Sequence, residues 1–320
     1  MKGAALEQSD DARGAPLGIL PAVRPLSALP MTHGVPGTLS PANEARASLA
    51  PVQTIAVAGG KGGTGKSSVT VNLAAALGAS GHEVLLLDGD LALGNIGRLL
   101  DLEPSHDLSH VMIGERRLEE VLLRGPRGVT VIPGANGVVE MANLSRIEHA
   151  GLIGLFSDLD VAADTLLIDL ASGLPDSVLA FSQAVREVIV VVCDEPAALQ
   201  DACATIRVLH ERCRVRRFRI VANRVESSRH GLDLYAALTR HAERHLDVLL
   251  DFCGSIPFDP QLCEAVRQRR TVIESFPRSP AALAFRKLAT RVTRWPRPAE
   301  PCGHVEFFVE RLGRSAAPQR

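Results

Sequence analysis

The sequence predicts one doubly wound α/β domain built on a mainly parallel sheet. From Gln53 onward, short apolar segments alternate with longer amphipathic ones, which is the order of strands joined by crossover helices. Several short segments, such as Val84–Leu87 and Val188–Val192, are apolar at every position, as expected of strands buried on both faces. The 320 residues are enough for a single large domain with a sizeable core.

The individual elements follow from this alternation. The expected strands are Thr54–Ala58, Val84–Leu87, Val129–Ile132, Leu166–Ile168, Val188–Val192, Phe218–Ala222 and Cys253–Ile256. The expected helices are Ser67–Leu77, Leu144–Phe156, Ala197–Glu211, Leu232–His245 and Pro280–Thr293. Residues 1–50 carry six prolines and five glycines without periodicity, which is typical of a flexible arm. We therefore expect an arm at 1–50, the domain at 51–296, and a linker with a short amphipathic helix at 297–320.

Composition excludes several classes of protein. A net charge of −1 and an aromatic content of 3% argue against a basic nucleic-acid coat or a platform that stacks bases. No apolar run approaches the roughly 18 residues that a membrane span needs. The six cysteines form no C-x-x-C pair, which argues against a zinc ribbon or an iron–sulfur carrier. We expect a cytoplasmic protein.

A phosphate-binding loop follows the first strand. Residues 60–67 match G-x-x-x-x-G-K-[ST] between a strand and a helix, the context in which backbone N–H groups and a helix N-terminus hold phosphate. Lys66 would meet the β- and γ-phosphates, and the Ser67 hydroxyl would bind Mg²⁺. The expected nucleotide contacts are Gly60, Gly62, Gly63, Thr64, Gly65, Lys66, Ser67 and Ser68.

Lysine usage singles out the same loop. Of the 35 basic residues, 31 are arginine, and two of the four lysines, Lys61 and Lys66, lie in this loop. A compact ammonium group fits where a planar guanidinium does not. This lysine usage indicates that the loop requires ammonium groups.

The pattern K-G-G-x-G-K-[ST] resembles the deviant Walker motif of the MinD/ParA ATPases. The resemblance implies a P-loop NTPase fold of the MinD/ParA type, slow ATP hydrolysis, and a Lys61 that reaches the ATP of a dimer partner. It also implies that Asp88 and Asp169 hold Mg²⁺ through water and that Asp90 orients the attacking water. Both metal-site residues end apolar strands, where doubly wound folds place ligands.

The same resemblance assigns three contacts to the nucleoside and one to the γ-phosphate. Asn223 follows the strand Phe218–Ala222 and would bond the adenine edge, and Pro257 and Asp259 follow the last strand and would cover base and ribose. The glycine that would face the γ-phosphate is Gly173.

Within this family, residues 52–312 are most similar to the FlhG/FleN regulators of flagellar number. The similarity includes the block at 303–312, which MinD and ParA proteins lack. It implies an ATP-dependent homodimer that restrains a FleQ-like transcription activator and also works with an FlhF-like GTPase. Two departures are Leu170, where the family has Thr or Ser, and Gly97, where it has Asp. The family's N-terminal element DQAxxLR has no full match at 1–50.

The alternative function is a ParA/MinD-type positioning ATPase that acts on DNA or on the membrane surface. A basic cluster could contact DNA phosphates, but such a run is more often a solvated turn, so no specific nucleic-acid binding is expected. The cluster comprises Arg212, Arg214, Arg216, Arg217 and Arg219.

The last apolar segment raises the question of membrane contact. Val305, Phe308, Val309 and Leu312 follow helical spacing within 305–312. Two glutamates there offset the nearby arginines, whereas membrane-surface helices favour Lys and Arg. Docking on the chain's own body is therefore favoured over the inner membrane or cell pole, with weak membrane contact left for the dimer.

Overall fold

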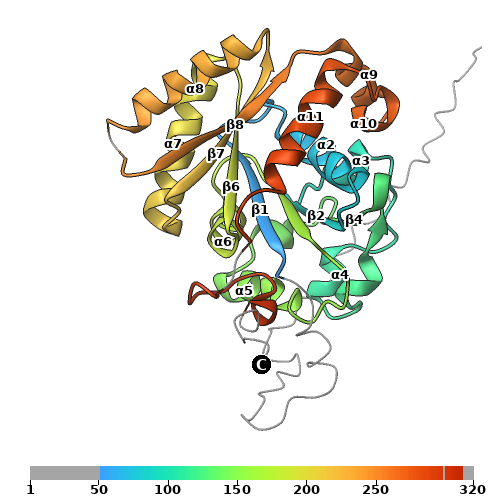
Figure 1. Ribbon diagram of the computed structural model, residues 1–320. Coiled ribbons are helices and arrows are strands. Elements are labelled where there is room, and N and C mark those ends of the chain that lie inside the picture. Colours follow the sequence, from blue (N-terminus) through green and yellow to red (C-terminus); the bar gives the residue numbers. More distant parts are fainter. Residues whose placement is uncertain (1–50, 245, 298–299, 313–320) are drawn as a thin grey trace, which may run out of the picture.

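The computed structural model describes residues 51–244, 246–297 and 300–312. These residues form an eight-stranded sheet in the order β3-β4-β2-β5-β1-β6-β7-β8 (Figure 1). The strands are β1 (Gln53–Gly59), β2 (Val84–Gly89), β3 (Leu123–Arg124), β4 (Val129–Ile132), β5 (Thr165–Leu170), β6 (Glu187–Val192), β7 (Arg217–Val225) and β8 (Leu249–Pro257). Every strand pair except β3–β4 is parallel. The predicted fold class is confirmed, and β3 is too short for a sequence pattern to reveal it.

Helices cover both faces of the sheet, as they must when both faces of the strands are apolar. The helices are α2 (Lys66–Ala79), α3 (Ile96–Leu99), α4 (Leu108–Met112), α5 (Arg146–Leu155), α6 (Asp176–Ala184), α7 (Pro196–Cys213), α8 (Ser228–Ala242), α9 (Pro260–Arg267), α10 (Val272–Ser275) and α11 (Pro280–Val292). One core lies under α2, α10 and α11, and the other under α5, α6, α7 and α8. Alternate residues of β1 divide between the two cores, Ile55 facing the first and Ala56 the second.

The predicted helices are present, with shifted ends. The helix expected at Leu232–His245 begins at Ser228, where Ser227 caps it by accepting a hydrogen bond from the N–H of His230 at 3.1 Å. It ends at Ala242, and His245 lies outside the described residues. The helices α3, α4, α6, α9 and α10 were not predicted.

The expected C-terminal helix is wrong. Within 305–312 the structure has a single 3₁₀ turn, Val309–Arg311, entered through Phe308 with a φ of 55°. Helical spacing would bury Val305, yet Val305 is exposed while Phe307 and Phe308 are both buried. The left-handed φ of Phe308 interrupts a regular helix at that residue, and the irregular backbone buries both phenylalanines while Val305 stays exposed.

The same segment packs onto the body of the chain, as its charge balance favoured. Phe307 and Phe308 meet the Phe156 ring edge-on, with centroids 4.8 Å and 5.8 Å away. Arg311 donates to the carbonyl oxygens of Leu159 and Val161 at 3.1 Å. Residues 1–50 and 313–320 lie outside the described residues. No helix in the described part of the chain is long and apolar enough to cross a membrane.

An ion cluster ties together the three strands at the β8 edge of the sheet. Arg219 on β7 donates to both carboxylate oxygens of Glu187 on β6 at 2.9 and 3.0 Å. It also donates to Asp251 on β8 at 2.6 Å and lies 4.6 Å from the centroid of the Trp295 ring. Only 9% of the Arg219 side chain and 11% of the Glu187 side chain are exposed. Removing one partner would therefore leave a poorly solvated charge.

We predict that Arg219→Met lowers the free energy of unfolding by about 3 kcal/mol, because it leaves the Glu187 carboxylate buried in the sheet without its cationic partner. Urea unfolding checks this value. Arg217→Met is the matched control: its side chain is 49% exposed and lies 3.7 Å from Asp251, so it should cost less than about 1 kcal/mol. Equal losses in the two variants would contradict a buried ion cluster.

Candidate functional site

The loop between β1 and α2 depends on glycines that no other residue could replace. Gly65 has a φ of 84° and is the N-cap of α2. A Cβ on Gly65 would lie 2.4 Å from the amide nitrogen of Asn223, and one on Gly60 would lie 2.2 Å from the carbonyl carbon of Asp201. Bare backbone at these points lets the loop lie close against β7 and α7.

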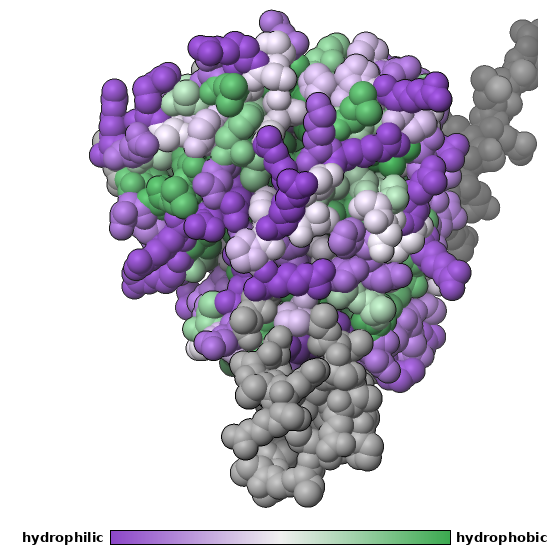
Figure 2. Space-filling model, in the orientation of Figure 1, coloured by the Kyte–Doolittle hydropathy of each residue, from purple (hydrophilic) through white to green (hydrophobic). Residues whose placement is uncertain are grey.

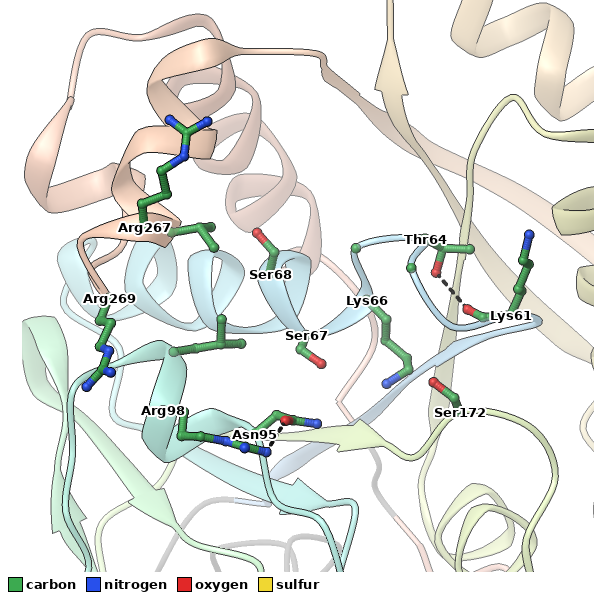
Figure 3. Close-up of a pocket in the computed structure, with 14 residues that line it drawn as sticks. Lys61, Thr64, Lys66, Ser67, Ser68, Asn95, Arg98, Ser172, Arg267 and Arg269 are labelled. Atoms are coloured by element: carbon green, nitrogen blue, oxygen red, sulfur yellow. Dashed lines mark hydrogen bonds between the residues drawn. The ribbon is translucent and has the colours of Figure 1, made fainter. Parts of the chain in front are cut away.

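The loop forms one wall of a cavity of about 490 Å³ (Figure 3). The loop residues that line it are Lys61, Gly63, Thr64, Gly65, Lys66, Ser67 and Ser68. The opposite wall and floor come from Asn95, Arg98, Leu99, Ser172, Val266, Arg267 and Arg269. The sequence predicted the residues of the loop as nucleotide contacts but not those of the opposite wall and floor.

The cavity is strongly cationic. Figure 3 shows Arg98, Arg267 and Arg269 on the side away from the loop, and none of the lining residues is acidic. Arg98 donates to Asn95 at 2.7 Å, and Arg269 donates to Asp101 at 3.0 Å. Cations on both walls, facing backbone N–H groups and a helix N-terminus, suit a polyanionic ligand such as a nucleotide phosphate chain. The basic run 267–270 was the available sequence signal, but spacing alone could not bring it to the loop.

Lys66 lies beneath the loop and is held by its own chain. It is 8% exposed, and its ammonium group donates to the Leu170 carbonyl and to Asp169 Oδ1, the latter at 3.4 Å. Thr70 Oγ1 donates to the same carboxylate oxygen at 3.1 Å. These contacts hold the ammonium group at the end of β5.

Two buried carboxylates lie side by side at the strand ends. Asp88 and Asp169 are register partners on β2 and β5 and are 1% and 2% exposed. The pKa of Asp88 is raised to about 7, chiefly by burial and also by the nearby Asp169 charge, against the lowering effect of N–H donors from Ile96 and Asp90. Burial also raises the pKa of Asp169, opposed by Lys66 and by hydrogen bonds from Ser67 and Thr70.

This donor set fits a magnesium ion. Carboxylate and hydroxyl oxygens are the ligands that Mg²⁺ prefers, and a divalent cation would offset the repulsion between the two carboxylates. Across the described residues, no group of three or more His, Cys, Asp or Glu side chains could hold a metal by itself. A Mg²⁺ ion here would therefore depend on Ser67, phosphate oxygens and water as well as on Asp88 and Asp169.

Asp90 and Gly173 lie beside the cavity, outside its lining. Asp90 is half-buried, and its Oδ1 accepts a hydrogen bond from the N–H of Leu93 at 3.3 Å. Gly173 has a φ of 80° and directly follows Ser172, which does line the cavity. A Cβ on Gly62 would lie 3.8 Å from Ser172 Oγ, so the turn after β5 faces the loop.

Lys61 points away from the cavity in Figure 3. Its side chain is 46% exposed and pairs with Glu195 at 3.3 Å. Arg224 also approaches Glu195, at 3.7 Å. Within one chain, then, the second lysine of the loop is paired outward and does not reach the position of Lys66.

The residues expected around the base lie elsewhere. Asn223 is buried behind the loop and donates to the Thr64 carbonyl at 2.7 Å, and its Oδ1 has no partner among the described residues. Asp259 uses both oxygens on backbone N–H groups, those of Gln261 at 2.9 Å and Ala281 at 3.0 Å. Pro257 lines a different cavity. Val266, Arg267 and Arg269 replace Pro257 and Asp259 as the residues of this segment that reach the cavity.

Comparison with known proteins adds independent findings. Residues 55–272 match the CobQ/CobB/MinD/ParA nucleotide binding domain. The chain is 49% identical over 265 residues to the antiactivator FleN of Pseudomonas aeruginosa, covering 83% of this chain and 95% of that protein. It is 29% identical to the flagellum site-determining protein YlxH of Helicobacter pylori, over 68% of this chain and 73% of that one. The septum site-determining protein MinD of Pyrococcus horikoshii, solved with Mg-ADP, superposes with a TM-score of 0.62 at 28% identity, over 76% and 96% of the two chains.

We predict that the unusual pKa of Asp88 shows in the pH dependence of stability. The folded-state pKa of about 7 exceeds the ordinary 3.8. At pH values between these two, Asp88 therefore takes up a proton when the chain folds. The stability due to protonated Asp88 is complete below about pH 4 and is lost as the pH rises to about 7. In the absence of Mg²⁺ and nucleotide, the free energy of unfolding of the parent should fall by up to about 4 kcal/mol, relative to that of Asp88→Asn, between pH 4 and pH 8.

Urea unfolding across this pH range measures the difference. Asp233→Asn, which alters a carboxylate that is 58% exposed on α8, is the control and should follow the parent. Parallel curves for the parent and Asp88→Asn would contradict the prediction.

Proposed function

The chain belongs to the CobQ/CobB/MinD/ParA family of nucleotide-binding proteins, and from this premise we propose that it is a dimerising ATPase switch that limits flagellar number by restraining a transcription activator. The observation that carries the proposal is the 49% identity to the antiactivator FleN over 95% of that protein's length. Similarity to a flagellum site-determining protein supports the same process. The chain is a P-loop ATPase.

ATP fits the cationic cavity with its phosphates against the loop. The N–H groups at the start of α2 would hold the β- and γ-phosphates, and Lys66 would exchange its contact with the Leu170 carbonyl for phosphate oxygens. Bound Mg²⁺ would neutralise charge between these phosphates. Arg267 and Arg269, with Val266, would border the nucleoside side of the cavity.

Asp90 is the residue we propose to orient the attacking water. Its carboxylate lies at the end of β2, two residues beyond Asp88, and is half-buried rather than fully enclosed. One of its oxygens is occupied by the N–H of Leu93, which fixes the side chain while the other oxygen stays available. Gly173, in the turn that faces the loop, would lie near the γ-phosphate.

Dimerisation follows from the outward position of Lys61. In the single chain its ammonium group pairs with Glu195 and does not reach the position of Lys66, so we propose that it serves the cavity of a second copy. An exposed ion pair of this kind is worth only about 0–1 kcal/mol. Breaking the pair between Lys61 and Glu195 therefore costs less free energy than contact between Lys61 and a polyphosphate would supply. ATP would thus favour the dimer.

We predict that Lys61→Ala still binds ATP but remains a monomer with ATP, because the variant keeps Lys66 and the loop N–H groups. Light scattering with and without ATP measures the mass, and fluorescent-nucleotide binding confirms occupancy. Arg224→Gln removes the other cation beside Glu195 and is the matched control, which should dimerise like the parent. An ATP-dependent dimer of Lys61→Ala would show that the trans role is wrong.

The alternative function, positioning on DNA through the arginine cluster, fits the structure less well. Arg219 is buried and engaged by Glu187 and Asp251. Arg217 lies 3.7 Å from Asp251, and Arg214 occupies the left-handed end of α7. The cluster therefore has a structural use within the chain, and a restraint that acts through partner proteins is the better proposal.

We predict an ATP-dependent complex with a FleQ-like activator. Light scattering of the purified activator with this chain should show a larger species with ATP than without, and Lys61→Ala should abolish the increase. An FlhF-like GTPase tested in the same way would reveal a second partner. If activator binding is absent with ATP although the chain dimerises, the antiactivator proposal fails while the ATPase switch stands.

A further inference from the structure

A second groove runs along the free edge of the sheet, away from the phosphate loop. It is a cavity of about 520 Å³ between α8 and α11, with the edge strand β8 as its floor. Apolar side chains remain exposed at its walls, with Leu232 at 44% and Leu283 at 48%. Phe258, directly after β8, is 59% exposed. Figure 2 shows apolar side chains interspersed with strongly hydrophilic ones on this upper part of the molecule.

Within the described part of the chain, side chains form hydrogen bonds to backbone carbonyl groups only in the first half of the edge strand β8. The Tyr235 hydroxyl donates to the Leu250 carbonyl at 2.6 Å, and Arg291 donates to the Cys253 carbonyl at 2.6 Å. The ladder to β7 is irregular at this point, and Gly254 adopts a φ of 142°. Beyond this irregularity the strand continues to Pro257 with no strand on its outer side. The open stretch is therefore about one short strand long.

The groove has a definite charge. Its lining includes Lys287 and Arg291 and no Asp or Glu. Lys287 is one of only four lysines among 35 basic residues, and it lies on α11 with its side chain exposed. A groove with apolar walls, cations and an open strand edge complements an extended peptide that carries both apolar and acidic side chains.

We propose that this groove binds an extended acidic segment of a partner protein, which lies along the end of β8 between α8 and α11. Its apolar side chains would contact Leu232 and Leu283, and a carboxylate would pair with Lys287. A second copy of this chain is a poorer occupant, because the same edge would bring its own Lys287 and Arg291 against these cations. The proposal does not depend on the antiactivator function.

One segment of the chain connects the groove to the nucleotide cavity. The segment that leaves β8 at Pro257 continues through α9 to Val266 and Arg269, which line the nucleotide cavity. Within this segment, Asp259 binds the N–H groups of Gln261 in α9 and Ala281 in α11. A peptide in the groove would therefore contact α11, which Asp259 joins to the segment that reaches the nucleotide cavity.

The test uses the full chain and a fluorescein-labelled nonapeptide of alternating valine and glutamate, followed by fluorescence anisotropy. Saturable binding is expected, weakened about tenfold or more by Lys287→Glu and also by Leu283→Asp. Lys287→Arg should bind like the parent. Arg294→Glu, on an exposed residue just beyond α11 that does not line the groove, is the matched charge control and should also bind like the parent.

Two further measurements locate the peptide. Excess Mg-ADP should leave binding intact, since the nucleotide cavity is a separate cationic site, and hydrogen exchange should slow at residues 254–258. No saturable binding, equal binding of a valine–lysine peptide, displacement by Mg-ADP, or unchanged affinity in Lys287→Glu would overturn the proposal. Because no activator or flagellar component enters the test, its failure would leave the antiactivator proposal untouched.

Discussion

The close approach of two buried carboxylates, one of which contacts a buried lysine, governs the chemistry of this molecule. Parallel pairing of β2 with β5 sets Asp88 opposite Asp169, and the turn of the loop places Lys66 between Asp169 and the Leu170 carbonyl. Burial disfavours the charged form of Asp88, and the neighbouring Asp169 charge adds to this effect, so the pKa of Asp88 rises to about 7. The site is electrostatically incomplete by itself, and a divalent cation with a nucleotide would complete it.

The parts of the site that sequence could reveal are those fixed by local geometry. The loop from Gly60 to Ser67 is a contiguous motif between a strand and a helix, and Asp88 and Asp169 end apolar strands, so their meeting at one sheet edge follows from parallel topology alone. The opposite wall was not predictable in this way. Arg98, Arg267 and Arg269 reach the cavity from α3 and from the end of α9. The periodicity of a sequence indicates local structure and does not show that such distant segments lie close to the loop. The C-terminal segment failed for a different reason: its apolar spacing is helical, but Phe308 adopts a left-handed φ of 55°, and the resulting backbone buries Phe307 and Phe308 and leaves Val305 exposed.

Asn223 and Asp259 lie next to the nucleotide cavity without lining it. Both follow strands at the edge that carries the site, as ligand-binding residues do in this fold class. Yet Asn223 supports the Thr64 carbonyl from behind the loop, and Asp259 joins α9 to α11 through two backbone N–H groups. Each therefore shapes the cavity without lining it. Substituting either residue would change nucleotide binding by moving a wall of the cavity.

The two departures from the family pattern fall where the structure tolerates them. At Leu170 the group that meets Lys66 is the backbone carbonyl, which any residue supplies, and the leucine side chain is fully buried in the core instead. Gly97 lies within α3, directly before Arg98, and a Cβ there would come within 3.1 Å of the Leu102 carbonyl. An aspartate at this point would crowd that turn and place a carboxylate beside the cationic wall. Glycine instead leaves the positive charge of Arg98 without an adjacent acid in the chain, which strengthens the attraction of this wall for a polyphosphate.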